Sequence, residues 1–139
     1  MARAFSCVAG PFFRIGTHCS YMPINFHYDP DVDILFARAE GLLTFDEILR
    51  HLNEEGDAKG IAHPEVFDAT QAHTDATAEQ VRVVVQRMIE MGRQGAFGPT
   101  AVITNNDVVF GMASMLAILS ELGGGPKVQA FRTFNEGLD

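Results

Sequence analysis

Apolar and polar residues alternate in two short segments near the start of the sequence, INFHY at 24–28 and ILFARA at 34–39. A period of two is typical of a β-strand with one buried face. The segment between them, DPDVD, contains the aspartate and proline residues that tight turns favour. The pattern therefore predicts a β-hairpin over residues 24–39.

The pattern then changes to the spacing of three to four residues that marks an amphipathic helix. Thr44 and Glu47 can form a capping box, in which the hydroxyl accepts a hydrogen bond from the amide of Glu47 and the carboxylate reaches back. Gly56 stands where a residue with left-handed backbone would cap the other end. We expect a helix between these positions. Its apolar positions are Phe45, Ile48, Leu49 and Leu52.

A second strand and helix follow. We expect a short strand at 65–68, then a polar loop, then a helix that begins at a second capping box, Thr77 to Gln80, and runs to about residue 94. The apolar stripe of this helix consists of Val81, Val84, Val85, Met88 and Met91.

A third strand and helix complete the pattern. We expect an apolar strand at 100–104, and the polar triplet NND at 105–107 can cap a helix over 108–122. After a glycine-rich turn, a last strand is expected at 128–132. A third capping box, at 133–136, would begin a final helix.

The predicted order is β-β-α-β-α-β-α-β-(α), and the chain is therefore expected to have an α/β fold. Strands that alternate with helices are typically parallel and joined by right-handed crossovers, whereas the hairpin makes the first strand antiparallel to the second. We expect one domain over residues 22–139. Residues 1–21, which hold Arg3 and Arg14 but no acidic residue, form an N-terminal arm or an upstream extension.

Composition narrows the class of partner. The 139 residues, 47% hydrophobic and 20% charged, fit one globular domain. A net charge of −8 would repel DNA and RNA, so we expect no nucleic-acid partner. No stretch reaches the roughly 20 apolar residues that span a bilayer, so we expect no membrane span. Cys7 and Cys19 are the only cysteines, and we expect free thiols in a reducing cytoplasm.

Several segments resemble a known family when they are taken together. They are the strand pair INFHY and DILFARAEG, the strand end VFDAT, the connection TAVITNND and the ending VQAFRTFNEG. In this order they resemble the STAS domain of anti-sigma-factor antagonists, and most of all its small stand-alone bacterial branch, which is largely of unknown function. The resemblance covers residues 22–139. It implies a four-turn β-α superhelix, a fold shared with CRAL-TRIO lipid-binding domains.

The same resemblance raises the question of a phosphorylation switch. Phosphorylatable members of the wider STAS family carry an Asp-Ser pair where the loop after the central strand enters its helix. No such pair lies between Asp68 and Thr77, although this segment also contains Thr70 and Thr74. We expect the Thr77 hydroxyl to cap the helix and not to serve a kinase.

Two groups of residues have the composition of a metal site. Three aspartates and one glutamate copy the ligand spacing of a calcium loop, namely Asp29, Asp31, Asp33 and Glu40. The position that requires glycine in such a loop is Ile34, so we interpret the segment as a hairpin turn. His63, His73 and Asp75 could together bind a metal, or the histidines could be solvated loop residues; their spacing matches no metal motif. We expect no metal and no cofactor.

Polar residues also gather where the parallel strands end. Open α/β sheets bind ligands beyond the carboxyl ends of their strands. The residues that would form a ligand or partner rim there are Asp68, Thr70, Asn105, Asn106 and Arg132.

The helix at 108–122, VVFGMASMLAILSEL, has no charge before Glu121. A helix that covers a sheet needs only an apolar stripe, so a second copy of the chain, the N-terminal arm or an apolar ligand must cover the rest. We favour a symmetric homodimer, because isologous dimers are the commonest oligomers. The candidate dimer interface consists of Val108, Met112, Met115 and Leu119, and a candidate apolar pocket is lined by Met88 and Met91.

Two functional hypotheses follow from these observations. The first is a non-enzymatic, STAS-like interaction or regulatory module that is homodimeric, cytoplasmic and able to contact another protein. The second is a carrier or binder of a small apolar or lipid-like ligand. No group of residues forms a recognisable catalytic constellation, so the sequence names neither a substrate nor a reaction.

Overall fold

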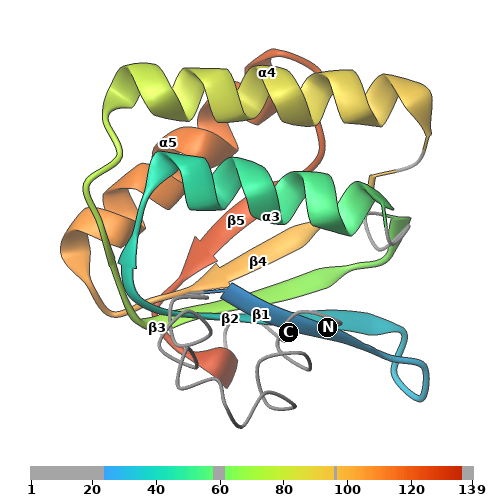
Figure 1. The fold of residues 1–139 in the computed structure, drawn as a ribbon, viewed down its shortest axis with the longest axis horizontal. Helices are drawn as coiled ribbons and strands as arrows, with labels where there is room; N and C mark the ends of the chain where they lie inside the picture. Colours follow the sequence, from blue (N-terminus) through green and yellow to red (C-terminus); the bar gives the residue numbers. More distant parts are fainter. Residues whose placement is uncertain (1–23, 58–61, 96, 136–139) are drawn as a thin grey trace, which may run out of the picture.

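The computed structural model describes residues 24–57, 62–95 and 97–135. Figure 1 shows their elements. They are β1 (Ile24–Asp29), β2 (Ile34–Leu43), α3 (Phe45–Asp57), β3 (Glu65–Thr74), α4 (Ala78–Gln94), β4 (Thr100–Ile103), α5 (Asp107–Leu122) and β5 (Val128–Phe131). The predicted order is confirmed as far as β5. The predicted arm at 1–21, both cysteines and the end of the last predicted helix lie outside the described residues.

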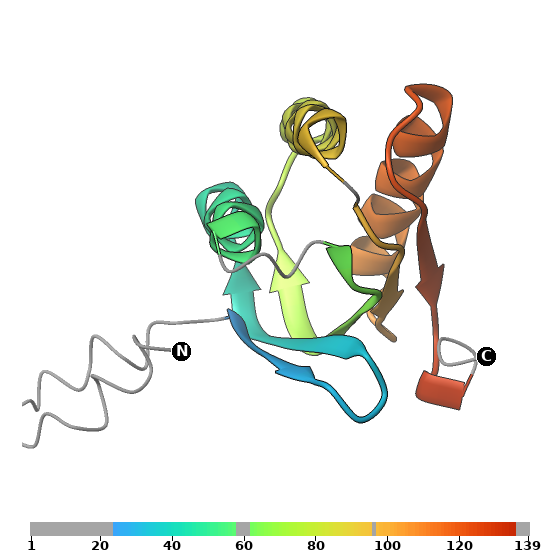
Figure 2. The ribbon, with the colours of Figure 1, turned by 90° about the vertical axis from the view of Figure 1, so that its right-hand side faces the viewer.

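The strands form one sheet in the order β1-β2-β3-β4-β5. β1 is antiparallel to β2 and the other neighbours are parallel, as predicted. From β2 onward, each strand lies next to the strand before it, always on the same side. Because the helical connections between such strands all have the same handedness, their helices lie on the same face of the sheet. Figure 2 shows α3, α4 and α5 on that face, with α4 above the space between the other two helices. This one-way winding is the predicted β-α superhelix.

The central strand β3 is longer than predicted. The expected strand at 65–68 continues to Thr74, because β2 also extends to Leu43 and provides pairing partners as far as that residue. Arg38 of β2 pairs with Asp68, and Glu40 pairs with Gln71. β3 therefore has one more residue than β2 between these pairs, which is a β-bulge. The Asp68 carboxylate accepts hydrogen bonds from the amide (3.0 Å) and the hydroxyl (2.6 Å) of Thr70. The polar loop predicted after residue 68 is therefore mostly strand.

The predicted helix starts are confirmed. Glu47 donates its amide to the Thr44 hydroxyl (3.3 Å), and its carboxylate accepts from the Thr44 amide (3.0 Å). Thr77 and Gln80 form the same reciprocal pair at the start of α4. The Asn106 side chain caps α5 by accepting from the amides of residues 108 and 109.

The predicted role of Gly56 is wrong. This residue lies inside α3 and is not among the glycines with a left-handed backbone. A Cβ atom at this position would lie 3.0 Å from Cε of Met91 in α4. The glycine therefore allows two helices to pack closely and does not end the first one.

The core lies between the sheet and the helices. Its helix side is built from valine, leucine and methionine residues, whereas the middle strands contribute small side chains. The small buried residues of β2 and β3 are Ala37, Ala39, Ala69 and Ala72. Because alanine reaches only a short way above a sheet, Ala69 leaves space below α4.

Candidate functional site

The structure brings the predicted rim residues to one edge of the sheet. Asp68 in β3 pairs with Ile103 in β4, which pairs with Phe131 in β5, so the three chain positions form one row. Arg132 directly follows β5, and Asn105 lies two residues after the end of β4. Asp68 and Thr70 instead lie inside β3, which continues to Thr74, so they do not follow the end of their strand as expected.

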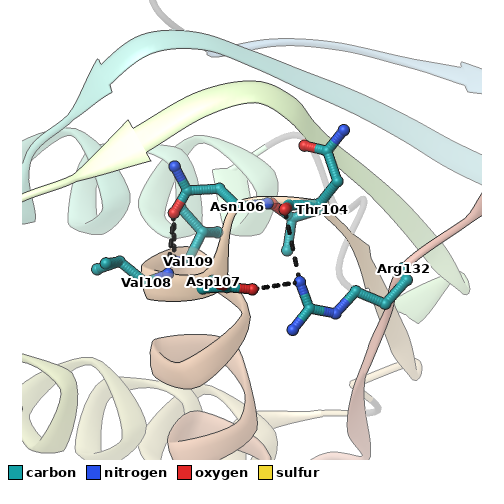
Figure 3. Close-up of polar contacts among 7 residues, drawn as sticks. Thr104, Asn106, Asp107, Val108, Val109 and Arg132 are labelled. Atoms are coloured by element: carbon teal, nitrogen blue, oxygen red, sulfur yellow. Dashed lines mark hydrogen bonds and ion pairs between the residues drawn. The ribbon is translucent and has the colours of Figure 1, made fainter.

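Most polar groups of this rim are engaged within the protein. The Arg132 guanidinium lies 2.8 Å from Asp107 Oδ1 and 3.5 Å from the Asn105 carbonyl oxygen. Figure 3 shows the contact between the side chains of Arg132 and Asp107. The guanidinium also lies 4.0 Å from the ring centroid of Phe110. Asn106 caps α5. The pairing of Asp107 with Arg132 was not predictable from the sequence, because the two residues are 25 positions apart. The rim contacts therefore hold β5 and the start of α5 together.

The three threonine hydroxyls of the suspected switch segment are hydrogen-bonded. The Thr70 hydroxyl donates to Asp68 (2.6 Å), and the Thr74 hydroxyl donates to the Leu43 carbonyl oxygen (2.7 Å). The Thr77 hydroxyl accepts from the Gln80 amide (3.2 Å), as the capping prediction required. Each hydroxyl therefore helps to hold a bulge, a strand end or a helix start.

The structure separates His63 and His73, the two histidines of the alternative metal site. His63 precedes β3 and His73 is close to its end, so at a rise of about 3.3 Å per residue they lie roughly 30 Å apart. His63 Nδ1 instead lies 2.8 Å from Asp33 Oδ1, which also accepts from the Tyr28 hydroxyl at 2.8 Å. Across the described ranges, no group of three or more histidine, cysteine, aspartate or glutamate residues could hold a metal ion.

Two residues of this surface cluster, Tyr28 and Asp33, have shifted pKa values. The hydrogen bond from Tyr28 stabilises the ionised carboxylate and holds the pKa of Asp33 below its ordinary value. The same hydrogen bond, together with the nearby negative charge, raises the pKa of Tyr28 above 10.0. We call this exposed group of Tyr28, Asp33 and His63 the hairpin clasp, because it joins the hairpin to the residue before β3.

His51 and Glu65 form a buried pair in the core that the sequence pattern did not indicate. His51 Nε2 on α3 lies 2.9 Å from Glu65 Oε2 at the start of β3, and their exposed fractions are 6% and 8%. The His51 ring contacts Phe26 and Phe67 edge to face, with centroid distances of 5.3 and 5.4 Å. The only sequence signal was that His51 lies between apolar neighbours on the buried side of its helix.

A cavity of about 130 Å³ lies between the helices and the sheet. Of the two methionines expected to line an apolar pocket, Met88 of α4 lines this cavity, whereas Met91 is buried but does not form part of its wall. Met112 and Ala113 of α5 line the opposite side. The walls are carbon and sulfur almost throughout, and the small side chain of Ala69 in β3 forms part of the floor on the sheet.

The opposite side of α5 carries exposed apolar side chains. Val108, Ile118 and Leu122 are 57%, 58% and 79% exposed. Gly111 lies on the same side of the helix, about one turn after Val108 and about two turns before Ile118. We call these four residues the outer face of α5. Of the candidate interface residues, Val108 lies on this face, Met112 points into the cavity, and Met115 and Leu119 are half-buried.

Comparison with known proteins shows the fold alone. No family in the scan matches the chain, and no curated protein matches it. The chain is similar to an uncharacterised DUF3478 family protein with a SpoIIAA-like fold from Shewanella loihica PV-4, at a TM-score of 0.54 and 15% identity. The similarity covers 84% of this chain and 89% of the other. The SpoIIAA-like, STAS-type fold implied by the sequence resemblance is thus confirmed.

Among the helices in the described part of the chain, none is both long enough and apolar enough to cross a membrane.

Proposed function

We propose that this chain is a non-enzymatic, cytoplasmic interaction module that forms a homodimer through the outer face of α5. The observation that carries the proposal is the row of apolar side chains on this face, three of which are more than half exposed. Exposed apolar rows of this kind mark association surfaces. The STAS-type fold supports a regulatory or interaction role. The polar groups of the rim mostly make contacts within the protein, which favours an association surface elsewhere.

The energetics favour a second copy that contributes more than its helix. Burying a fully exposed valine, leucine or isoleucine is worth about 1.5–3 kcal/mol, so each of these three contributes roughly 1–2 kcal/mol and a symmetric pair of helices about 6–12 kcal/mol. Association costs about 4–15 kcal/mol. The helix pair is therefore close to break-even, and adjacent surface must take part.

The adjacent surface is the edge of the sheet. α5 packs on β5, which is the last strand of the sheet, so both lie at one end of the domain (Figure 2). A Cβ atom at Gly111 would have no neighbour within 4 Å, so the backbone there is open to close approach by another helix. An isologous dimer would bring two copies of α5 and β5 together around one axis.

The oligomeric state of the purified protein tests the proposal. Light scattering after size-exclusion chromatography should give twice the monomer mass for the wild type and the monomer mass for Ile118→Glu. Val83→Glu is the matched control, because Val83 is an apolar residue of α4 with a similar exposed fraction, 49%. The control should remain dimeric.

Two results would overturn the proposal. A monomeric wild type at high micromolar concentration would exclude the homodimer. A dimeric Ile118→Glu protein with unchanged affinity would show that the outer face of α5 is not the interface.

A further inference from the structure

We propose that the cavity beneath α4 is a binding site for a small, uncharged, apolar molecule about as large as one aromatic ring. This site lies on the inner side of α5, whereas the proposed dimer interface lies on its outer side. The inference does not depend on dimerisation, since a monomer would keep the same cavity.

The size of the cavity sets the size of the ligand. Its volume is about 130 Å³, close to that of an engineered cavity of about 150 Å³ in another protein, which is dry and binds benzene. A long acyl chain would not fit without a large movement of the helices. Protein interiors rarely contain voids much larger than a water molecule, so a space of this size at the centre of the domain is a departure from ordinary packing.

The position of the cavity follows from the fold. α4 lies above the space between α3 and α5 and not directly on the sheet (Figure 2). Below it, Ala69 of β3 and Ala113 of α5 are small wall residues that do not fill the gap. Larger side chains from the three helices close the space around them, including Leu52, Val84, Met88, Met112 and Leu116.

The chemistry of the walls selects against charge. The polar residues of the wall are bonded to other groups of the protein: His51 to Glu65 at 2.9 Å, Thr74 to the Leu43 carbonyl oxygen at 2.7 Å, and Thr100 to Glu65 at 3.4 Å. A bound molecule therefore meets mainly carbon and sulfur. A charged ligand would lose its hydration without compensation. Methionine sulfur makes favourable contacts with aromatic rings, which favours an aromatic ligand.

Methionine methyl resonances offer a direct test with benzene as the probe. Met88 and Met112 line the cavity, whereas Met91 and Met115 do not. In protein labelled with carbon-13 at the methionine methyl groups, benzene should shift the signals of the first pair in a saturable way. The signals of the second pair should stay in place. Sodium benzoate at the same concentration should shift none of them.

A variant that fills the cavity gives a second test. Ala113→Leu places three more carbons in the wall and should abolish the response to benzene. The control is Ala78→Leu, which adds the same atoms at an exposed position at the start of α4. At ten times its Kd, benzene should raise the Tm of the wild type and the control by about 3–6 °C, and leave that of Ala113→Leu unchanged.

The proposal is overturned if benzene shifts neither Met88 nor Met112, or if all four methionines respond equally. It is also overturned if Ala113→Leu binds benzene as the wild type does. If Ala113→Leu does not fold, the experiment on wild-type methionines decides the question alone. Neither result depends on whether the protein is a dimer.

Discussion

Removal of the Glu65 carboxylate is the most informative single change to the core. Glu65 is 8% exposed and lies 2.9 Å from His51, which is 6% exposed. Breaking a buried pair by replacing one partner typically costs about 3–5 kcal/mol, because the other partner keeps its desolvation cost and loses the interaction. We therefore expect Glu65→Leu to lower the free energy of unfolding by about 3–5 kcal/mol.

This loss is large for a domain of this length. At about 0.05–0.15 kcal/mol per residue, a protein of 139 residues has a free energy of unfolding of roughly 7–20 kcal/mol. Urea unfolding followed by circular dichroism measures the change. The midpoint should fall by roughly 2 M for an m-value of about 2 kcal/mol/M, and m itself should not change.

A double-mutant cycle separates the pair from the cost of the cavity that leucine creates. His51→Phe keeps a ring between Phe26 and Phe67, which contact the histidine edge to face. When both partners are replaced by apolar groups, no buried polar group is left without its partner, so the double variant should be much more stable than the sum of the single losses predicts. If the two losses add to within about 0.5 kcal/mol, His51 and Glu65 do not interact energetically and our reasoning is wrong.

Three further predictions follow from individual contacts. Asn106→Ala removes both cap hydrogen bonds of α5, at 2.9 and 3.0 Å, and should cost about 1 kcal/mol in urea unfolding; a change near zero would show that the cap is not needed. Asp33→Asn should return the raised pKa of Tyr28 to about 10, and spectrophotometric titration near 295 nm that finds no change would contradict the hydrogen bond. Because each chain carries a net charge of −8, raising sodium chloride from 0.1 to 1 M, which shortens the screening length from about 10 to 3 Å, should tighten the dimer in sedimentation experiments; weaker association would indicate ion pairs at the interface.

The pH dependence of the hairpin clasp has a definite sign. The folded-state pKa of Asp33 is lower than its ordinary value, so its contribution to stability is present above the ordinary aspartate pKa, about 3.9. The contribution is lost as the pH falls through the lower folded-state pKa. Solvent screens this contribution, because the carboxylate is exposed.

Local features were predictable because their interactions span only a few residues. The capping boxes at Thr44 and Thr77 each connect residues three positions apart, and the structure confirms both. The turn after β1 likewise depends on neighbours, since the Asp29 carboxylate accepts from the Asp31 amide at 2.9 Å. The element order then follows from the alternation of strands and helices.

Features that depend on distant partners were not predictable. The extension of β3 beyond Asp68 requires residues 40–43 of β2 as partners, and a polar sequence such as QAHT gives no sign of them. Glycine is typical of helix ends, yet Gly56 lies inside α3, where Met91 of α4 packs against it. His51 has an ordinary helical position, and only the fold brings Glu65 within 2.9 Å of it.

The sequence by itself determined the order of the elements, the helix starts and the presence of an unusually apolar helix at 108–122. Only the tertiary structure decided which side of that helix faces inward, because a helix that is apolar on nearly all sides has no polar face to mark its orientation. Packing on β5 and α4 directs Met112 into the cavity and leaves Ile118 and Leu122 exposed. The cavity was unpredictable for a related reason. Its walls come from side chains that are far apart in the sequence and meet only when the sheet and helices pack, so its volume depends on the tertiary structure.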